Sequence, residues 1–212
     1  FIPHHDIRFG KTGYLIEVDV TDNVNGDLLD INGQVLIEVN DQGEIINEFD
    51  FGKILSDHML ENNDNPSNFN RSPINWFHGN SSIYDQTDNS IITSSRENFV
   101  MKVGYDDKKI KWIFGDPTKH WYVNFPSLQA LALSTDSDYP IGQHSLSMEG
   151  DSLMLFNNGL PSFRNPDNTP SGEPLSSSKT SKYLINENDM VAERVWNYDP
   201  GIYSGVCSSI FR

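Results

Sequence analysis

Apolar and polar residues alternate along several short segments of this chain. Tyr14, Ile16 and Val18 fall on one face of an extended segment, and the same spacing recurs at Val35 and Ile37. Alternation with a period of two, bounded by turns rich in Asn, Asp and Gly, is typical of half-buried antiparallel strands. The pattern therefore predicts an all-β fold.

The strand pattern recurs three times in the same arrangement. Each unit opens with a histidine, continues through a strand, a turn and a strand, and ends with a second strand pair around an acidic turn. Four strands in each repeat are typical of the blades of a β-propeller. We expect one domain holding about three blades and part of a fourth, with units at about 1–52, 74–116 and 141–200 and a partial unit at 203–212.

The connections between these units are long and mostly polar. Segment 51–61 predicts a short helix, because Ile54, Leu55 and Met59 fall on one side of it. Long loops in a compact domain are usually functional or disordered. On a propeller we expect them to cover one end of the axis.

Charge and cysteine content exclude several classes of protein. The sequence has 30 acidic residues against 15 lysines and arginines, a net charge of −15. No basic run is present to neutralise phosphates, so we expect no nucleic-acid partner. No apolar stretch reaches the roughly 18 residues that a membrane-spanning helix needs. Cys207 is the single cysteine, cannot form an internal disulfide, and is interpreted as structural.

Three histidines open the three units, at His5, His78 and His144. Equivalent positions in successive blades point toward one axis, so we expect these side chains to converge on one site. Three histidines in one place could ligate a metal ion, which would suit a metal-dependent hydrolase or lyase. A propeller that only binds a partner, with its histidines packed, is a further interpretation.

The second unit adds groups that bind anions. His78 and Asn80 are two residues apart and share one face of a strand. The hairpin that turns at 85–89 brings Arg96 back beside His78. A guanidinium fork, an imidazole and an amide together predict an oxyanion-binding site. Because a guanidinium beside a metal cation is unfavourable, this set favours an anion over a metal.

Five motifs carry a resemblance to a known family. They are H-H-D at 4–6, W-x-H-x-N-S at 76–81, D-x-x-D-x-S-I-I-x-S-S-R at 85–96, K-W-I at 111–113 and G-Q-H at 142–144. Over nearly its whole length the chain resembles the bacterial arylsulfotransferases that do not use a nucleotide sulfate donor. The resemblance implies a six-bladed β-propeller that moves a sulfuryl group from a phenolic sulfate ester to a phenol. It implies a ping-pong course without a metal or other cofactor.

The resemblance also implies roles for individual residues. The histidine of the Q-H motif, His144, would be transiently sulfurylated. The groups expected to surround the sulfuryl group are His78, Asn80, Arg96 and His5. Weaker candidates for substrate contacts are His4, Trp76 and Arg164.

Either His4 or His5 could supply the histidine of the H-H-D motif. We prefer His5, because Ile7 and Phe9 follow it with the spacing of two apolar residues that follow His144. Periplasmic members of the family often have a cysteine pair before the Q-H motif, and segment 116–141 has no cysteine.

The resemblance further implies an extracytoplasmic protein. The sequence starts with Phe inside a strand pattern and has no visible signal segment, so we expect a piece of a longer protein. The ring would then be completed by the remaining blades of the same protein or by a second copy.

Overall fold

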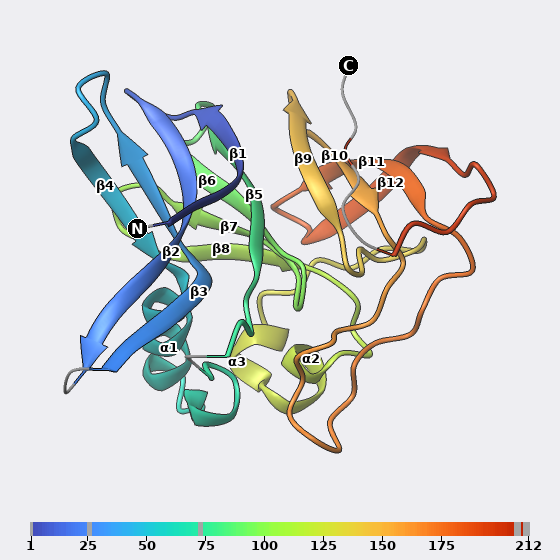
Figure 1. The fold of residues 1–212 in the computed structure, drawn as a ribbon. Helices are drawn as coiled ribbons and strands as arrows, with labels where there is room; N and C mark the ends of the chain where they lie inside the picture. The colour runs from blue at the N-terminus through green and yellow to red at the C-terminus, as the bar shows by residue number, and fades with distance from the viewer. Residues whose placement is uncertain (1, 25–26, 72–73, 206–208, 210–212) are drawn as a thin grey trace.

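The computed structural model describes residues 2–24, 27–71, 74–205 and 209, and between 20 and 33 it describes backbone alone. Within these residues the strands form three antiparallel sheets, each of four consecutive strands (Figure 1). The first sheet contains β1 (Ile2–Phe9), β2 (Tyr14–Val24), β3 (Asp27–Val39) and β4 (Ile45–Asp50). The second contains β5 (Gly79–Asp85), β6 (Ser90–Ser95), β7 (Val100–Gly104) and β8 (Ile110–Phe114). The third contains β9 (His144–Glu149), β10 (Ser152–Asn157), β11 (Lys179–Asn186) and β12 (Val191–Tyr198). The prediction of an all-β fold is confirmed.

The helices gather below the sheets in the view of Figure 1. They are α1 (Phe51–Glu61), a 3₁₀ turn η1 (Pro66–Asn68), α2 (His120–Asn124) and α3 (Pro126–Gln129). Helix α1 matches the predicted segment. Asp50 caps it by accepting a hydrogen bond from the backbone N of Lys53 at 3.0 Å. Among the described residues, no helix is long and apolar enough to cross a membrane.

The second sheet is buried on both faces. Successive residues of β6, β7 and β8 alternate between two apolar clusters, as the period of two requires. Ile91 and Ile113 face the first sheet and the helices, whereas Ile92 and Trp112 face the third sheet. Burial of a side chain as large as Trp112 stabilises the contact between sheets by about 1.5–3 kcal/mol. The two clusters therefore fix the second sheet between its neighbours.

Unlike both faces of the second sheet, the outer faces of the first and third sheets expose large apolar side chains. Phe9 is 82% exposed on β1, and Trp196 and Tyr198 are 47% and 58% exposed on β12. Within the described residues Trp196 therefore does not pack between sheets, whereas Trp112 does. Cys207 and most of the predicted partial unit at 203–212 lie outside the described residues.

The first strands of the three sheets lie side by side. Strands β1 and β9 both contact β5, which runs between them in Figure 1. His78 directly precedes β5 and His144 is the first residue of β9, whereas His5 lies within β1 at its register shift. The adjacent strands bring the three histidines together near the centre of the molecule.

Candidate active site

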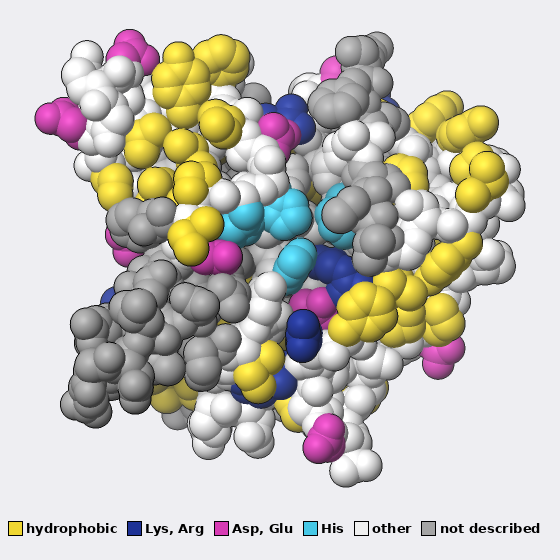
Figure 2. Space-filling model, in the orientation of Figure 1, with side chains coloured by type: hydrophobic (Ala, Val, Ile, Leu, Met, Phe, Trp, Pro, Cys, Tyr) yellow, Lys and Arg dark blue, Asp and Glu magenta, His cyan; other side chains and the backbone are white. Residues whose placement is uncertain are grey.

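The structure brings the three predicted histidines together. The ring centroid of His5 lies 5.3 Å from that of His78 and 6.5 Å from that of His144. Figure 2 shows the histidine side chains as one group in a hollow at the centre of this face, next to lysine and arginine side chains. Residues from three different sheets therefore share one site.

A similar local distortion presents each histidine. A register shift occurs near the start of β1, near the start of β5, and in β10 opposite the start of β9. The backbone is left-handed at His5 (φ 60°), at His78 (φ 50°) and at Ser145 next to His144 (φ 55°). Such bulges re-aim side chains beside functional sites, and left-handed non-glycine residues store strain there.

Arg96 lies beside His78 because of the β5–β6 hairpin. The backbone N of Arg96 donates to the carbonyl O of His78 at 3.0 Å. Arg96 is 4% exposed: its Nη1 pairs with Glu97, and its Cζ lies 4.0 Å from the ring centroid of Phe163. Nη2 is buried and has no hydrogen-bond partner among the described residues. An unpaired N–H group of a buried guanidinium is suited to an anion.

The carboxylate of Glu97 holds this arginine in place. Burial alone would raise the pKa of Glu97, but Arg96 and hydrogen bonds including one from Ser162 at 2.6 Å lower it. Behind it, Lys119 donates from Nζ to the carbonyl O of Glu97 at 2.9 Å, and complete burial lowers the pKa of Lys119 to about 8. The arginine is thus anchored on one side and open on the other.

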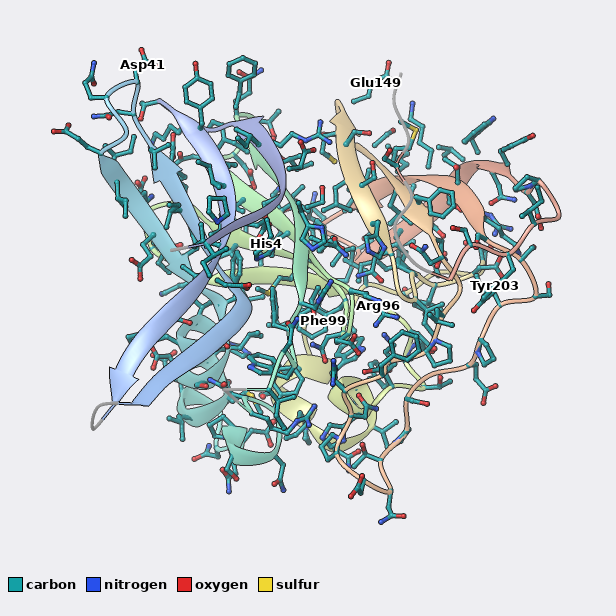
Figure 3. All side chains as sticks on the ribbon, in the orientation of Figure 1. His4, Asp41, Arg96, Phe99, Glu149 and Tyr203 are labelled. Carbon is teal, nitrogen blue, oxygen red and sulfur yellow. The ribbon has the colours of Figure 1, made fainter. Side chains whose placement is uncertain are left out.

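These groups line a cavity of about 250 Å³. Its walls are Asn75, His78, Arg96, Glu97, His144, Phe163 and Arg164. In Figure 3, His4 and Arg96 lie near the middle of the molecule, whereas Asp41 and Glu149 mark hairpin tips at its edge. The cavity thus combines two histidines and two arginines with one exposed aromatic ring.

A larger cavity of about 470 Å³ lies elsewhere, between the β5–β6 and β11–β12 turns. Lys102 is at its wall, and its Nζ is 3.0, 2.9 and 2.6 Å from carboxylate oxygens of Asp85, Asp88 and Glu187. Because three carboxylates surround this single ammonium group, the cluster links the second and third sheets and is not a site for an anion.

His144 has its ring nitrogens in different environments. Nδ1 is 3.0 Å from the carbonyl O of Gly142, which can only accept, so Nδ1 carries the proton. Nε2 then holds the lone pair, and it has no hydrogen bond to a described residue. Burial lowers the pKa of His144 and so keeps the ring neutral. A neutral imidazole with a free lone pair is a nucleophile.

His78 has the opposite arrangement. Nδ2 of the Asn75 amide lies 2.8 Å from Nδ1 of His78, and an amide N–H can only donate. Neutral His78 therefore carries its proton on Nε2. Burial first, and then the neighbouring charge that His5 would carry, lower the pKa of His78 to about 4. For His5, partial burial and then His4 and His144 lower the pKa to about 4.

Asn80 contacts the segment that leads into His144. Its Nδ2 donates to the carbonyl O of Gln143 at 2.9 Å. Gln143 in turn donates from Nε2 to the carbonyl O of Ser95 at 2.8 Å. The asparagine of the H-x-N motif and the glutamine of the Q-H motif thus connect the start of β9 to β5 and β6, and they fix where His144 stands relative to Arg96.

The remaining candidates differ in their positions. His4 packs its ring on His5 at 4.8 Å between centroids and places Nε2 3.3 Å from Oδ1 of Asp19. Arg164 lines the cavity. Trp76 is only 2% exposed and donates from Nε1 to Gln34 at 2.9 Å, so it belongs to the core and not to the cavity wall.

Three residues of the site carried no signal in the sequence. Asn75 and Glu97 are polar neighbours of motif residues, and only their contacts with His78 and Arg96 distinguish them. Phe163 lies in a loop far along the chain, and it is brought to Arg96 by backbone hydrogen bonds of that loop to Glu97. Among the described residues, no group of three His, Cys, Asp or Glu side chains has a geometry that could hold a metal ion.

Comparison with known proteins supports the sequence resemblance. The sequence pattern of the family described as Arylsulfotransferase (ASST) matches residues 2–211. A relative from Escherichia coli O6:H1 (strain CFT073), named arylsulfate sulfotransferase AssT, is 32% identical over 142 residues, covering 58% of this chain and 23% of that protein. A relative of the same name from Lelliottia amnigena is 29% identical over 141 residues, again covering 58% and 23%. The matched region is thus less than a quarter of the length of these relatives.

One solved structure is similar over most of the chain. It is a putative 6-phosphogluconolactonase from Bacteroides fragilis NCTC 9343, with 11% identity and a TM-score of 0.45, covering 95% of this chain and 43% of that one. The family match over residues 2–211 includes all five motifs and every residue that lines the cavity. The chain therefore belongs to the arylsulfotransferase family.

Proposed function

We propose that the protein transfers a sulfuryl group from a phenolic sulfate ester to a phenolic acceptor through a sulfurylated His144. The observation that carries the proposal is the pairing of two groups in one cavity. One is His144 with its lone pair on Nε2, and the other is Arg96 with an unpaired Nη2. The family membership supports the sulfuryl group as the anion.

In the first half-reaction the Nε2 lone pair of His144 forms a bond to sulfur. The bond between sulfur and the aryl oxygen breaks, the phenolate leaves, and the imidazole ring becomes positively charged. Arg96 and the Nε2–H of His78 donate to the sulfuryl oxygens, as preorganised donors do in related group transfers. Asn80 and His5 complete this set in the proposal.

Once protonated, His5 or His78 can give a proton to the departing phenolate and return to the neutral state. In the empty site both imidazoles are neutral, because burial lowers the pKa of each to about 4. A bound sulfate ester carries a negative charge, which raises the proton affinity of nearby imidazoles. In the second half-reaction the acceptor phenol gives its proton to the neutral imidazole that protonated the first phenolate, the phenol oxygen bonds to sulfur, and the bond between sulfur and Nε2 of His144 breaks. No metal or nucleotide takes part in either step.

The proposed architecture is a six-bladed propeller in which each of the three sheets is one blade. The buried faces of the second sheet and the adjacent first strands support this reading. The exposed apolar faces of the outer sheets then contact further blades, from the same protein or from a second copy. We propose an extracytoplasmic location for the whole protein.

The function is tested by turnover of a chromogenic aryl sulfate by the full-length protein with a phenol acceptor. We expect the product phenol and the sulfated acceptor to form in equal amounts, with no effect of a chelator. Absence of turnover would favour a binding module, and loss of turnover with a chelator would favour a metal-dependent enzyme. Either result would contradict the proposal.

A further inference from the structure

Asn158 makes a contact with His144 that none of the family motifs includes. Its Oδ1 lies 2.7 Å from Nδ1 of His144, closer than the carbonyl O of Gly142 at 3.0 Å. The side chain is fully buried and lies directly after the end of β10. It is not among the residues that line the cavity, so it approaches the imidazole from the side away from the substrate.

The orientation of the Asn158 amide is fixed by its own contacts. Its Nδ2 donates to the carbonyl O of Ser204 at 2.8 Å, so Oδ1 must face His144. Its backbone O accepts a hydrogen bond from Oγ of Ser178 at 2.9 Å. Ser178 also accepts from the backbone N of Ser204 at 2.7 Å, which closes the network. The amide therefore presents an acceptor to Nδ1 and cannot present a donor.

We propose that Asn158 is a positioning residue that holds His144 in the Nδ1–H form and stabilises its ring when that ring becomes positively charged. The role of Asn158 in turnover rests on the proposed function, whereas its effect on the His144 tautomer does not. When Nε2 bonds to sulfur, the positive charge spreads over the ring, and the hydrogen bond from Nδ1–H to Oδ1 becomes a charge-assisted one.

The choice of an amide over a carboxylate follows from the same contact. An aspartate at this position would hold Nδ1–H but would add a negative charge that favours the protonated ring. The lone pair on Nε2 would then be occupied by a proton over more of the pH range. A neutral acceptor fixes the proton on Nδ1 while burial keeps the pKa of His144 below its usual value.

The matched control is Asn157, the residue just before it. Asn157 is equally buried, but its Oδ1 accepts from the backbone N of Ile141 at 3.0 Å and its Nδ2 donates to the carbonyl O of Tyr139 at 2.8 Å. It holds the loop without touching His144. Asn158→Ala and Asn157→Ala thus both remove a buried amide, and only the first removes the acceptor on the imidazole.

The direct test is nitrogen NMR of the full-length protein labelled in its histidines, with the His144 signals assigned by their loss in His144→Gln. We expect wild type and Asn157→Ala to have His144 protonated on Nδ1 when neutral. Asn158→Ala leaves only the longer contact from Nδ1 to the carbonyl O of Gly142, so the Nε2–H form should become more populated than in wild type. Asn158→Asp should raise the pKa of His144 by about one unit or more.

Turnover is measured on the same variants. Asn158→Ala should lower kcat by about ten- to hundredfold, as expected for loss of one hydrogen bond to a charged group. Asn158→Asp should move the acidic limb of the pH–rate profile to higher pH, and Asn157→Ala should leave that limb in place.

The outcomes separate the two proposals. If the His144 tautomer and pKa are the same in Asn158→Ala, Asn158→Asp and wild type, the positioning role is wrong, whether or not the protein turns over aryl sulfates. If the NMR changes appear but the wild type does not transfer sulfuryl groups, the proposed function is wrong and the contact from Asn158 stands.

Discussion

At the scale of single residues, only one of the two terminal nitrogens of the Arg96 guanidinium has a partner in the part of the chain that the structure describes. Nη1 pairs with Glu97, whereas Nη2 has no partner among the described residues. Arg96→Lys keeps the positive charge but loses the planar fork that can pair with Glu97 and a sulfuryl oxygen together. We predict that turnover falls about tenfold or more.

Arg194 provides the control for this substitution. It pairs through Nη1 with Asp138 at 2.9 Å on the third sheet, and it does not line the cavity. Arg194→Lys should change turnover by less than about twofold, the scale of a partly exposed ion pair. If both lysine variants keep the wild-type rate, Arg96 does not contact the sulfuryl group.

Glu17 is a buried acid that makes folding stability depend on pH. Complete burial raises its pKa to about 7, although a hydrogen bond from Ser82 lowers it in part. Between its unfolded and folded pKa values the unfolded chain is ionised and the folded chain is not, so stability falls as pH rises through this window. We predict that Glu17→Gln is more stable than wild type at pH about 8, by on the order of 3 kcal/mol, and equally stable at pH about 4.

Glu38 offers a comparison for this measurement. It is as buried as Glu17, but its carboxylate accepts hydrogen bonds from the backbone N of Thr12 and Gly13 and from the hydroxyl of Tyr105. Glu38→Gln removes charge-assisted hydrogen bonds and should destabilise the protein near neutral pH. Chemical denaturation of both variants across pH tests the prediction; a Glu17→Gln variant that is less stable than wild type at pH about 8 would contradict it.

Some of these residues could be identified from the sequence and others could not. His78, Asn80 and Arg96 lie in one hairpin, and hairpin pairing is local, so their proximity was predictable. Trp76 lies in the same motif as His78 but points into the core, where its Nε1–H donates to the side chain of Gln34. Because Gln34 is far away in sequence, this orientation was not predictable. Contacts between distant loops have no sequence signature.

At the scale of elements, Gly142 sets the start of β9. It has φ 64°, and a Cβ added there would lie 2.6 Å from the carbonyl O of Leu160. Gly150, in the β9–β10 turn, has φ 58° and open space around it. Alanine has a similar backbone strain of roughly 1 kcal/mol at both positions, but only Gly142→Ala also forces main-chain atoms apart.

We therefore predict a difference between two alanine variants. Gly142→Ala should move His144 and reduce turnover by at least about tenfold, because small displacements of a reacting group have large effects on rate. Gly150→Ala should lower the melting temperature slightly and leave turnover unchanged. Equal turnover in the two variants would show that β9 tolerates a shift at its first residues.

The elements were predictable where the pattern is local. Helix α1 follows from its apolar side and its Asp50 cap, and the alternating strands follow from their period of two. The left-handed backbone at His5 and His78 was not predictable, because residues other than glycine give no sign of such a conformation in sequence. These bulges nevertheless decide where the imidazoles point.

At the scale of the whole molecule, apolar side chains remain exposed on both outer sheets. Ile7 and Phe9 on β1 and Val195 and Trp196 on β12 are each between 47% and 82% exposed. If further blades cover these faces, residues 1–212 expressed alone should self-associate. Light scattering should then give a mass above the 24.0 kDa of one chain. A monodisperse monomer with aryl sulfate activity would mean that no further blades are needed.

The convergence of three histidines from three sheets was predictable from the repeat alone, because equivalent positions face one axis. The role of each histidine depends on which of its ring nitrogens carries a proton, and the repeat does not determine that. The carbonyl O of Gly142 holds the proton of His144 on Nδ1, which leaves the lone pair on Nε2. The amide N–H of Asn75 donates to Nδ1 of His78, which leaves the proton of His78 on Nε2. The chemistry of the site therefore depends on Nε2 of His144.

The most direct measurement is mass spectrometry of the full-length protein after mixing with an aryl sulfate and no acceptor. We expect one added sulfuryl group on the peptide that contains His144, its loss when a phenol is added, and neither adduct nor turnover in His144→Ala. An adduct on another residue, or sustained sulfuryl transfer by folded His144→Ala, would contradict it.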